Sequence, residues 1–329
     1  MAEDLRSITI LVPGKLHEHA VARISDTFKL VSIDRIDPAL VTPELRDTVR
    51  GVAAAPAIGG SFVGPDFLRA LPKAEIIANF GVGYDGIDAA YAGRQGIMVT
   101  NTPDVLTEEV ADTAIGLLIS TIREFSPAER WLREGDWKRN GNYPQSRLTL
   151  RGRTVGIFGL GRIGIAVARR LEAFGLAIAY HNRRPVEGVA YAYHATLKDL
   201  AEAVDTLICI APGGAATENA VNAQILSALG AEGVLVNIGR GSTVDEAALA
   251  KALADGTIAA AGLDVFADEP NVPQSLLDAP NTLLLPHIAS ASIHTRRAMA
   301  DLCVDNLIAW FRDGNALTPV PETVGVKPK

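Results

Sequence analysis

The sequence predicts an α/β fold with two doubly wound parallel-sheet domains. Its 329 residues are enough for two domains of about 150 residues each. Short apolar segments alternate with helical patterns along almost the whole chain, which is typical of a parallel sheet wound with helices. These apolar segments form two series, separated by a long helical stretch at residues 108–134. Two such series predict two sheets.

The strands are predicted from the apolar segments in chain order. In the first series they lie at residues 8–12, 52–56, 76–80 and 97–101. In the second series they lie at residues 154–159, 176–181, 206–211, 234–238, 258–265 and 282–285. A helix is expected to begin near Lys15, and the last helix, 292–313, could pack on either domain. The tail, 319–329, contains three prolines and is expected to be loosely held.

We predict that the chain crosses between the two domains twice. A turn at residues 101–103 marks the first crossing, and an irregular segment at 286–292 marks the second. The first domain is then discontinuous, with residues 1–101 and 288–329, and the second spans residues 102–287. A cleft is expected between these two domains.

Composition excludes several classes of protein. Apolar residues make up 48% of the chain and charged residues 21%, as in soluble globular proteins. The net charge of −7 argues against a nucleic-acid partner, and no segment is apolar for long enough to cross a membrane. Cys209 and Cys303 lack metal-ligand spacing, so we expect buried thiols, no metal site and a cytoplasmic location.

A glycine turn predicts a dinucleotide site in the second domain. Gly159, Gly161 and Gly164 match the pattern G-x-G-x-x-G, and they follow a predicted strand and open a predicted helix. The first glycine allows the tight turn, the second lets the backbone approach a pyrophosphate, and the third lets helix and strand pack closely. The helix N-terminus offers free N–H groups to the phosphates. We therefore predict a Rossmann-type domain in which Leu160, Arg162 and Ile163 complete the turn.

The end of the next strand indicates which dinucleotide is bound. An NAD-preferring domain carries an acidic residue about 20 positions after the glycines. This chain has Asn182 there, followed by Arg183 and Arg184. Guanidinium groups bind a 2′-phosphate that a carboxylate would repel, so NADP, with NADPH preferred, is favoured over NAD. The alternative is that the two arginines are an ordinary solvated pair.

Three residues at predicted strand ends could assist the reduction of a carbonyl group by a nicotinamide. Arg240, Glu269 and His287 each follow a strand of the second series, at the edge where α/β proteins bind ligands. Taken singly, they could be a surface arginine, a solvated acid and a packed histidine. Together they supply a cation for an anionic substrate, a carboxylate and a proton donor.

These segments resemble the D-isomer-specific 2-hydroxyacid dehydrogenase family, most closely its glyoxylate/hydroxypyruvate and hydroxyphenylpyruvate reductase branch. The resemblance covers residues 79–319 and consists of many motifs in order. The motifs lie at residues 82–85, 99–107, 159–164, 239–241, 262–266, 269–270 and 286–287.

The resemblance implies a flavodoxin-like substrate domain, a catalytic role for all three strand-end residues, and a homodimer. His287 would protonate the carbonyl oxygen, Glu269 would hydrogen-bond the imidazole, and Arg240 would bind the substrate carboxylate. The backbone N–H groups of Val82 and Gly83 would bind that carboxylate from the other domain. Further residues match positions that contact the cofactor: Thr107, Ala211, Pro212, Thr217, Ile238, Gly239, Asp264, His287 and Ser290.

The function expected is therefore NADPH-dependent reduction of small 2-oxo acids, such as glyoxylate and hydroxypyruvate, to D-2-hydroxy acids. One alternative is an NAD-dependent D-2-hydroxyacid or phosphoglycerate dehydrogenase. Another, from a different class, is a dinucleotide-sensing binding protein similar to transcriptional corepressors. Intact Arg240, Glu269 and His287 favour an enzyme.

Overall fold

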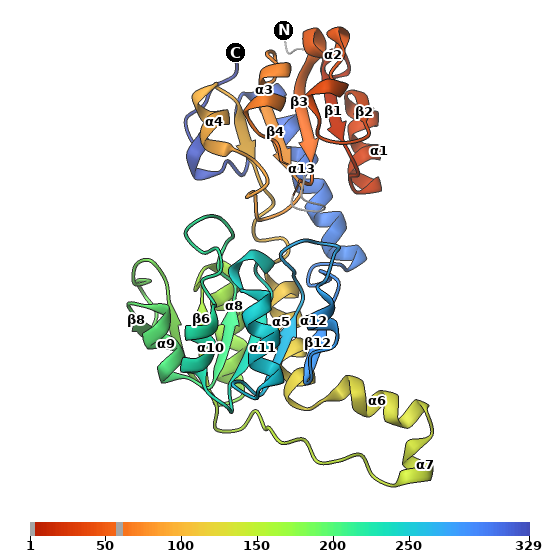
Figure 1. Ribbon diagram of the computed structural model, residues 1–329. Helices are drawn as coiled ribbons and strands as arrows, with labels where there is room; N and C mark the ends of the chain where they lie inside the picture. Colours follow the sequence, from red (N-terminus) through yellow and green to blue (C-terminus); the bar gives the residue numbers. More distant parts are fainter. Residues whose placement is uncertain (1–3, 57–61) are drawn as a thin grey trace. The chain divides into compact units, whose positions relative to one another are not determined.

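The computed structural model describes residues 4–56 and 62–329 and contains two compact units (Figure 1). Unit 1 comprises Met1–Leu106 and Ala291–Lys329, and unit 2 comprises Thr107–Ser290. The expected domain boundaries, after residues 101 and 287, lie a few residues before these. Residue Ile58, in the predicted loop after the second strand, lies outside the described residues.

Unit 1 is built on a five-stranded parallel sheet with the order β2-β1-β3-β4-β5. This is the flavodoxin-like order, so the predicted fold class is confirmed for this unit. The strands are β1 (Thr9–Pro13), β2 (Lys29–Ile33), β3 (Val49–Ala54), β4 (Ile76–Asn79) and β5 (Met98–Thr100). The helices are α1 (Glu18–Thr27), α2 (Pro43–Thr48), α3 (Pro65–Ala70), α4 (Ala89–Arg94) and α13 (Ile293–Asp313), with short 3₁₀ helices at Leu5–Ser7, Pro38–Leu40 and Pro321–Thr323.

Helix α13 belongs to unit 1 although the whole of unit 2 precedes it in the chain. Its apolar side is buried, with Trp310 only 1% exposed, and the Cys303 thiol lies 3.6 Å from the Ala78 carbonyl in β4. Arg23 of α1 pairs with Asp301 and Asp305 of α13, which joins the two helices. Both the apolar and the charged side of α13 are therefore used within unit 1.

The tail is not loosely held, so that expectation is wrong. The Val320 N–H donates to the Val99 carbonyl of β5 at 2.9 Å, and Val320 is 1% exposed. The Thr323 hydroxyl, which is fully buried, donates to the same carbonyl at 3.1 Å. The prolines of the tail are compatible with this pairing. A proline lacks an N–H donor of its own, but the residues beside it can still hydrogen-bond to a sheet edge.

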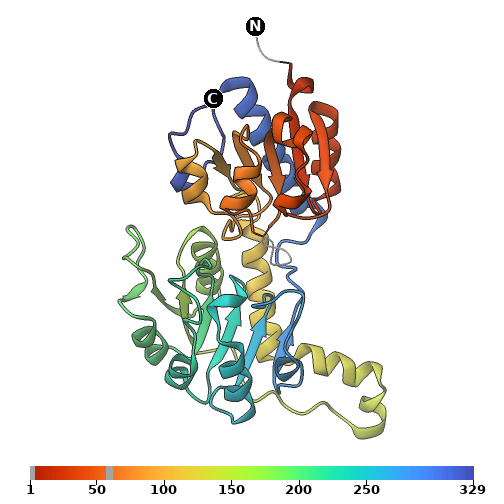
Figure 2. The ribbon, with the colours of Figure 1, turned by 45° about the horizontal axis from the view of Figure 1, so that its top comes forward.

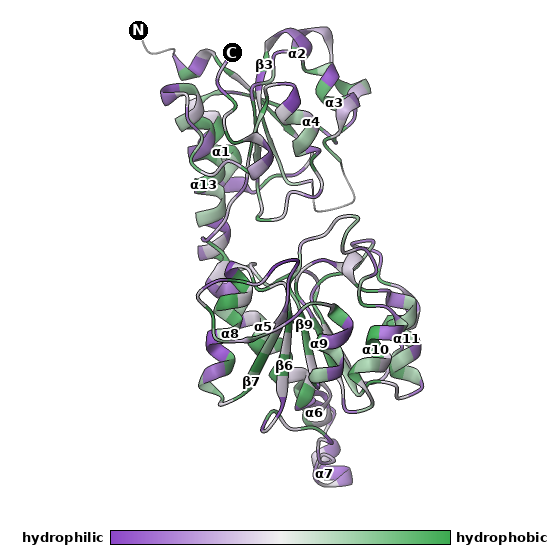
Figure 3. Cartoon of the chain, turned by 90° about the vertical axis from the view of Figure 1, so that its left-hand side faces the viewer, coloured by the Kyte–Doolittle hydropathy of each residue, from purple (hydrophilic) through white to green (hydrophobic). Residues whose placement is uncertain are grey.

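Unit 2 is built on a seven-stranded parallel sheet with the order β12-β11-β10-β9-β6-β7-β8. Apart from the extra strand β12, this is the Rossmann order, with the reversal between β6 and β9. The strands are β6 (Thr154–Phe158), β7 (Ala177–His181), β8 (Ala192–His194), β9 (Thr206–Cys209), β10 (Val234–Asn237), β11 (Ala260–Leu263) and β12 (Thr282–Leu284). The helices are α5 (Thr107–Ile122), α6 (Phe125–Arg133), α7 (Asp136–Asn140), α8 (Arg162–Ala173), α9 (Leu197–Ala203), α10 (Ala223–Leu229), α11 (Glu246–Ala254) and α12 (Gln274–Leu277), with a 3₁₀ helix at Gly241–Thr243. In Figure 3 the strands of this sheet are mostly coloured hydrophobic, and the helices beside it contain both hydrophobic and hydrophilic residues.

The predicted long helix, 108–134, is wrong as a single element. Helix α5 ends at Ile122, Glu124 adopts a left-handed backbone with φ of 56°, and α6 begins at Phe125. Pro127 explains the break, because a proline fits the first turn of a new helix but not the interior of an existing one. Helices α6 and α7 project from the rest of unit 2 as an arm (yellow in Figures 1 and 2).

None of the helices in residues 4–56 and 62–329 is both long and apolar enough to span a bilayer.

Candidate functional site

The glycine turn lies where the strand order of unit 2 reverses, between β6 and β9. Gly159 has φ of 104°, and a Cβ atom there would lie 2.6 Å from the Ala211 backbone nitrogen. A Cβ at Gly164 would lie 2.5 Å from the Gly159 carbonyl oxygen. Both positions therefore require glycine for the turn itself and for the close packing of α8.

Gly161 is a glycine for a different reason. Its φ of −95° suits any residue, and a Cβ there would meet nothing within 4 Å. The backbone at the N-terminus of the 12-residue helix α8 is thus open on this side. An open glycine followed by the N-terminus of a helix fits the pyrophosphate of a dinucleotide.

The strand beside the turn ends in a carboxamide and two guanidinium groups. Asn182 Oδ1 accepts the Leu160 N–H at 2.7 Å, and its Nδ2 donates to the Leu160 carbonyl at 3.2 Å. The Asn182 side chain therefore braces the turn. Arg183 and Arg184 are exposed, and neither forms an ion pair within the described part of the chain. Both remain available to an anionic ligand.

Arg240 follows β10 on a braced backbone. The Asn237 side chain, 1% exposed, donates to the Arg240 carbonyl at 2.9 Å and accepts the Gly239 N–H at 3.1 Å. The Thr243 hydroxyl donates to the same Arg240 carbonyl at 2.7 Å. The backbone position from which the guanidinium extends is therefore fixed.

Glu269 and His287 form a hydrogen-bonded pair. The imidazole Nδ1 lies 2.7 Å from the carboxylate Oε2, while Oε1 accepts the Phe266 N–H at 3.0 Å. Burial alone would raise the pKa of the Glu269 carboxyl, but the His287 hydrogen bond, the Phe266 N–H and the Arg240 charge together lower this pKa below its ordinary value. The carboxylate is thus kept ionised, and Nδ1 carries the proton of the shared hydrogen bond. The other ring nitrogen, Nε2, is not used in this pair.

Asp264 fixes the backbone that carries His287. Its two carboxylate oxygens accept the N–H groups of Ile288 and Ala289 at 2.7 and 2.9 Å, and its carbonyl accepts the His287 N–H at 2.8 Å. Burial raises the pKa of the Asp264 carboxyl, and the two N–H groups partly offset this. His287 itself has φ of 54°, a left-handed conformation that is rare for a residue with a side chain.

The remaining predicted cofactor residues lie on the same unit. Ala211, Ile238 and Ser290 are buried, and Thr107 begins α5. The Thr217 hydroxyl donates to the Pro212 carbonyl at 2.6 Å, which closes the loop after β9. Val82 and Gly83 belong to unit 1, in the loop after β4.

Unit 2 has a glycine turn at the switch point of its parallel sheet, and on the same edge an imidazole paired with a carboxylate. This combination is typical of nicotinamide-dependent dehydrogenases. The family model described as "D-isomer specific 2-hydroxyacid dehydrogenase, NAD binding domain" matches residues 115–289. The chain belongs to this family and is an NAD(P)-dependent 2-hydroxyacid dehydrogenase.

Individual relatives extend the similarity over both units. A glyoxylate/hydroxypyruvate reductase A of Arabidopsis thaliana is 46% identical over 277 residues, 84% of this chain and 86% of the relative. A hydroxyphenylpyruvate reductase of Plectranthus scutellarioides is 44% identical over 267 residues, 80% of this chain and 84% of the relative. The crystal structure of an NADPH-dependent glyoxylate/hydroxypyruvate reductase of Sinorhizobium meliloti, in complex with NADP and malonate, has a TM-score of 0.93 and 61% identity, with 96% of this chain and 98% of that chain covered.

Three asparagines at strand ends hold loops in place and were not predicted. Asn79 and Asn237 each close a buried strand, and Asn101 follows the end of β5. For Asn79 and Asn237, the available signal was one polar residue at the end of an apolar run. A buried carboxamide there needs partners, and these two side chains bond to the loop that follows. Asn101 instead bonds to the Val82 carbonyl of an earlier loop.

Proposed function

We propose that this enzyme reduces small 2-oxo acids, glyoxylate and hydroxypyruvate among them, to D-2-hydroxy acids with a preference for NADPH. The observation that carries the proposal is the pair formed by His287 and Glu269 at 2.7 Å, beside Arg240. The names of the Arabidopsis and Sinorhizobium relatives support the substrate class.

The cofactor preference rests on the end of β7. Where NAD-preferring domains carry an acidic residue, this chain has Asn182, whose carboxamide is bonded to Leu160. Arg183 and Arg184 are exposed beside it. Guanidinium groups placed there would bind the 2′-phosphate. The NADP complex of the Sinorhizobium relative supports this assignment.

The chain's own groups divide the chemistry between them. Bound nicotinamide supplies the hydride. His287 Nε2 donates a proton to the carbonyl oxygen of the substrate, and Glu269 keeps the ring oriented through its hydrogen bond to Nδ1. In unit 2, Arg240 binds the substrate carboxylate and polarises the carbonyl. In unit 1, the Val82 and Gly83 N–H groups are donors for a carboxylate.

Initial rates test this proposal directly. Glyoxylate, hydroxypyruvate, pyruvate and hydroxyphenylpyruvate would each be measured with NADH and NADPH. We expect glyoxylate or hydroxypyruvate to give the highest kcat/KM, and NADPH to exceed NADH by at least ~10-fold, or about 1.4 kcal/mol. Equal use of the two cofactors would overturn the NADPH preference. No reduction of any 2-oxo acid would overturn the substrate class.

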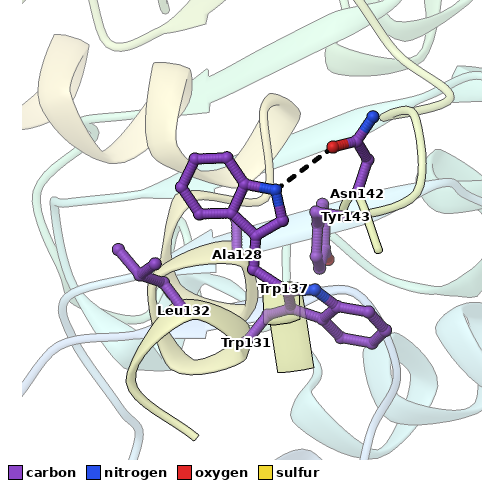
Figure 4. A pocket seen from close by; sticks show the side chains of 6 residues that line it. All are labelled: Ala128, Trp131, Leu132, Trp137, Asn142 and Tyr143. Carbon is purple, nitrogen blue, oxygen red and sulfur yellow. Dashed lines mark hydrogen bonds between the residues drawn. The ribbon is translucent and has the colours of Figure 1, made fainter. Parts of the chain in front are cut away.

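We also propose that the enzyme is a homodimer that uses the arm of unit 2. Leu132 and Trp137 are 55% and 59% exposed and line one hollow of the arm (Figure 4). The arm is ordered by its own contacts: the Trp137 indole donates to Asn142 Oδ1 at 3.2 Å, and the Trp131 and Tyr143 rings meet edge to face at 5.8 Å. A preformed, apolar and exposed surface of this kind suits a second copy of the chain.

A further inference from the structure

The loop that follows β4 has three consecutive carbonyl groups bound by two asparagine side chains. Asn79 Nδ2 donates to the carbonyls of Gly81 and Gly83 at 2.9 and 3.0 Å. Asn101 Nδ2 donates to the carbonyl between them, that of Val82, at 2.8 Å. The carbonyls at residues 81–83 are therefore fixed by side chains from the ends of β4 and β5.

Because each peptide bond is planar, a carbonyl group that is held in place also fixes the direction of the N–H group in the same peptide. In a trans peptide the C=O of one residue and the N–H of the next point in opposite directions. The Gly81 carbonyl, held by Asn79 and by the Thr102 N–H at 2.9 Å, thus directs the Val82 N–H away from these donors. The Val82 carbonyl held by Asn101 directs the Gly83 N–H in the same manner. Asn79 therefore shares the orientation of the Val82 N–H with the Thr102 backbone, and Asn101 orients the Gly83 N–H.

Among residues 4–56 and 62–329, no group accepts a hydrogen bond from the Val82 or Gly83 nitrogen. Backbone donors are paired in the great majority of native positions. Adjacent free N–H groups in a rigid loop fit an anion.

Both asparagines are themselves held in place by the fold. Asn79 is 1% exposed at the end of β4. The Asn101 carbonyl accepts the Thr318 hydroxyl at 2.6 Å, and the Asn306 side chain of α13 donates to that hydroxyl at 2.8 Å. The Asn101 position is therefore tied to the helix that covers the sheet, so the N–H pair is presented by a fixed scaffold.

We infer that Asn79 and Asn101 are positioning residues that aim the Val82 and Gly83 N–H groups at the carboxylate of the substrate. The inference rests on the proposed function, and it assigns to two further side chains the task of preparing the carboxylate site. An asparagine is needed because its nitrogen donates, whereas the isosteric aspartate presents only acceptors to the loop carbonyls.

The variants Asn101→Asp, Asn101→Ala and Asn79→Asp test this inference. We expect KM for glyoxylate and Ki for malonate to rise about 10-fold or more, because misdirected N–H groups lose a charge-assisted contact. The Kd for NADPH should stay within about twofold, because the loop and the glycine turn lie on different units. Asn79 is buried, so Asn101→Ala keeps the test valid if Asn79→Asp fails to fold. Asn315→Asp is the matched control, since Asn315 is exposed and donates to the Asp313 carbonyl in the same unit.

The outcomes separate this inference from the function on which it rests. Unchanged KM and Ki in the folded Asn101 variants would overturn it. So would a joint loss of Tm, kcat and NADPH affinity with an unchanged Ki, which would mark a purely structural role. A wild-type enzyme that reduces no 2-oxo acid would overturn the proposed function, whereas malonate titration of wild type and variants would still report on the N–H pair.

Discussion

The side chain of Asn182 and the backbone of Leu160 form a reciprocal pair, with hydrogen bonds of 2.7 and 3.2 Å. The second position of the glycine turn is therefore tied to the end of the neighbouring strand, β7. Since the carboxamide is used to hold the turn, the groups that can distinguish the two nicotinamide dinucleotides are the arginines that follow it.

Replacing both arginines should abolish the preference for NADPH. We expect the double variant Arg183→Ala/Arg184→Ala to lower kcat/KM for NADPH at least ~10-fold and to change that for NADH little, because only NADPH carries the 2′-phosphate. Steady-state kinetics with each cofactor would measure this. Arg151→Ala is the control, since Arg151 is exposed but precedes β6 at the opposite edge of the sheet. Equal losses with both cofactors would remove the two arginines from 2′-phosphate recognition.

Two glycines of the turn should respond differently to the same substitution. Gly161→Ala should leave Tm nearly unchanged and weaken NADPH binding, because the methyl group meets no protein atom within 4 Å but occupies the open side of the turn. Gly164→Ala should lower Tm, because its methyl group would lie 2.5 Å from the Gly159 carbonyl oxygen. Calorimetry and NADPH titration would separate the effects. Normal NADPH affinity in the Gly161→Ala variant would argue against a pyrophosphate at this position.

The lowered pKa of Glu269 predicts how stability depends on pH. An acid whose folded pKa lies below its ordinary value of 4.5 stabilises the fold above pH 4.5, and this contribution is lost as the pH falls through the lowered pKa. The Tm deficit of Glu269→Gln should therefore be largest near neutrality and shrink in acid.

Glu246→Gln provides a comparison of opposite sign. Burial raises the pKa of Glu246, so its ionised form is disfavoured in the fold at neutral pH. The Tm of Glu246→Gln should therefore rise relative to that of wild type as the pH rises. Parallel pH trends in the two variants would contradict the assigned pKa directions.

A charge on the arm should dissociate the proposed dimer. Leu132→Asp should shift the molecular mass measured by light scattering from dimer toward monomer, because it buries an unpaired carboxylate in the interface. Leu317→Asp is a matched control, since Leu317 has the same 55% exposure but lies in unit 1. A monomeric wild type, or a dimer that survives Leu132→Asp, would contradict the assigned interface.

Removing the proposed proton donor should separate chemistry from cofactor binding. His287→Ala should lower kcat by about 100-fold or more, as is typical for loss of a general acid, and leave NADPH affinity nearly unchanged. His287→Gly should lose the same activity yet have a higher Tm than His287→Ala, because glycine adopts a φ of 54° without strain. Turnover close to wild type in either variant would remove His287 from the mechanism.

The sequence predicted the elements that depend on local pattern. Buried strands such as β4 and β10 are short apolar runs, and the residues that follow them are at the ligand-binding edge whatever the tertiary detail. Strands β2 and β8 were missed because they lie at sheet edges and are partly exposed, so their residues are not continuously apolar. The catalytic candidates could be predicted because they follow strand ends.

Other features depend on contacts between distant parts of the chain. The role of Asn101 depends on the Val82 carbonyl 19 residues earlier and on Thr318, 217 residues later. Likewise, the paired tail could not be predicted from its prolines, because its partner is the edge of β5. No local pattern encodes a partner at that separation.

The return of the chain to unit 1 has a consequence for synthesis on the ribosome. Residues 107–290 emerge as a complete unit before α13 exists, so the nucleotide-binding sheet can fold first. The nascent sheet of unit 1 must wait, without Trp310 and Cys303 to cover it and without Thr318 to secure Asn101. In a ribosome-bound chain the cofactor-binding unit can therefore form first, and the loop proposed to bind the substrate becomes competent only after α13 and Thr318 have been added.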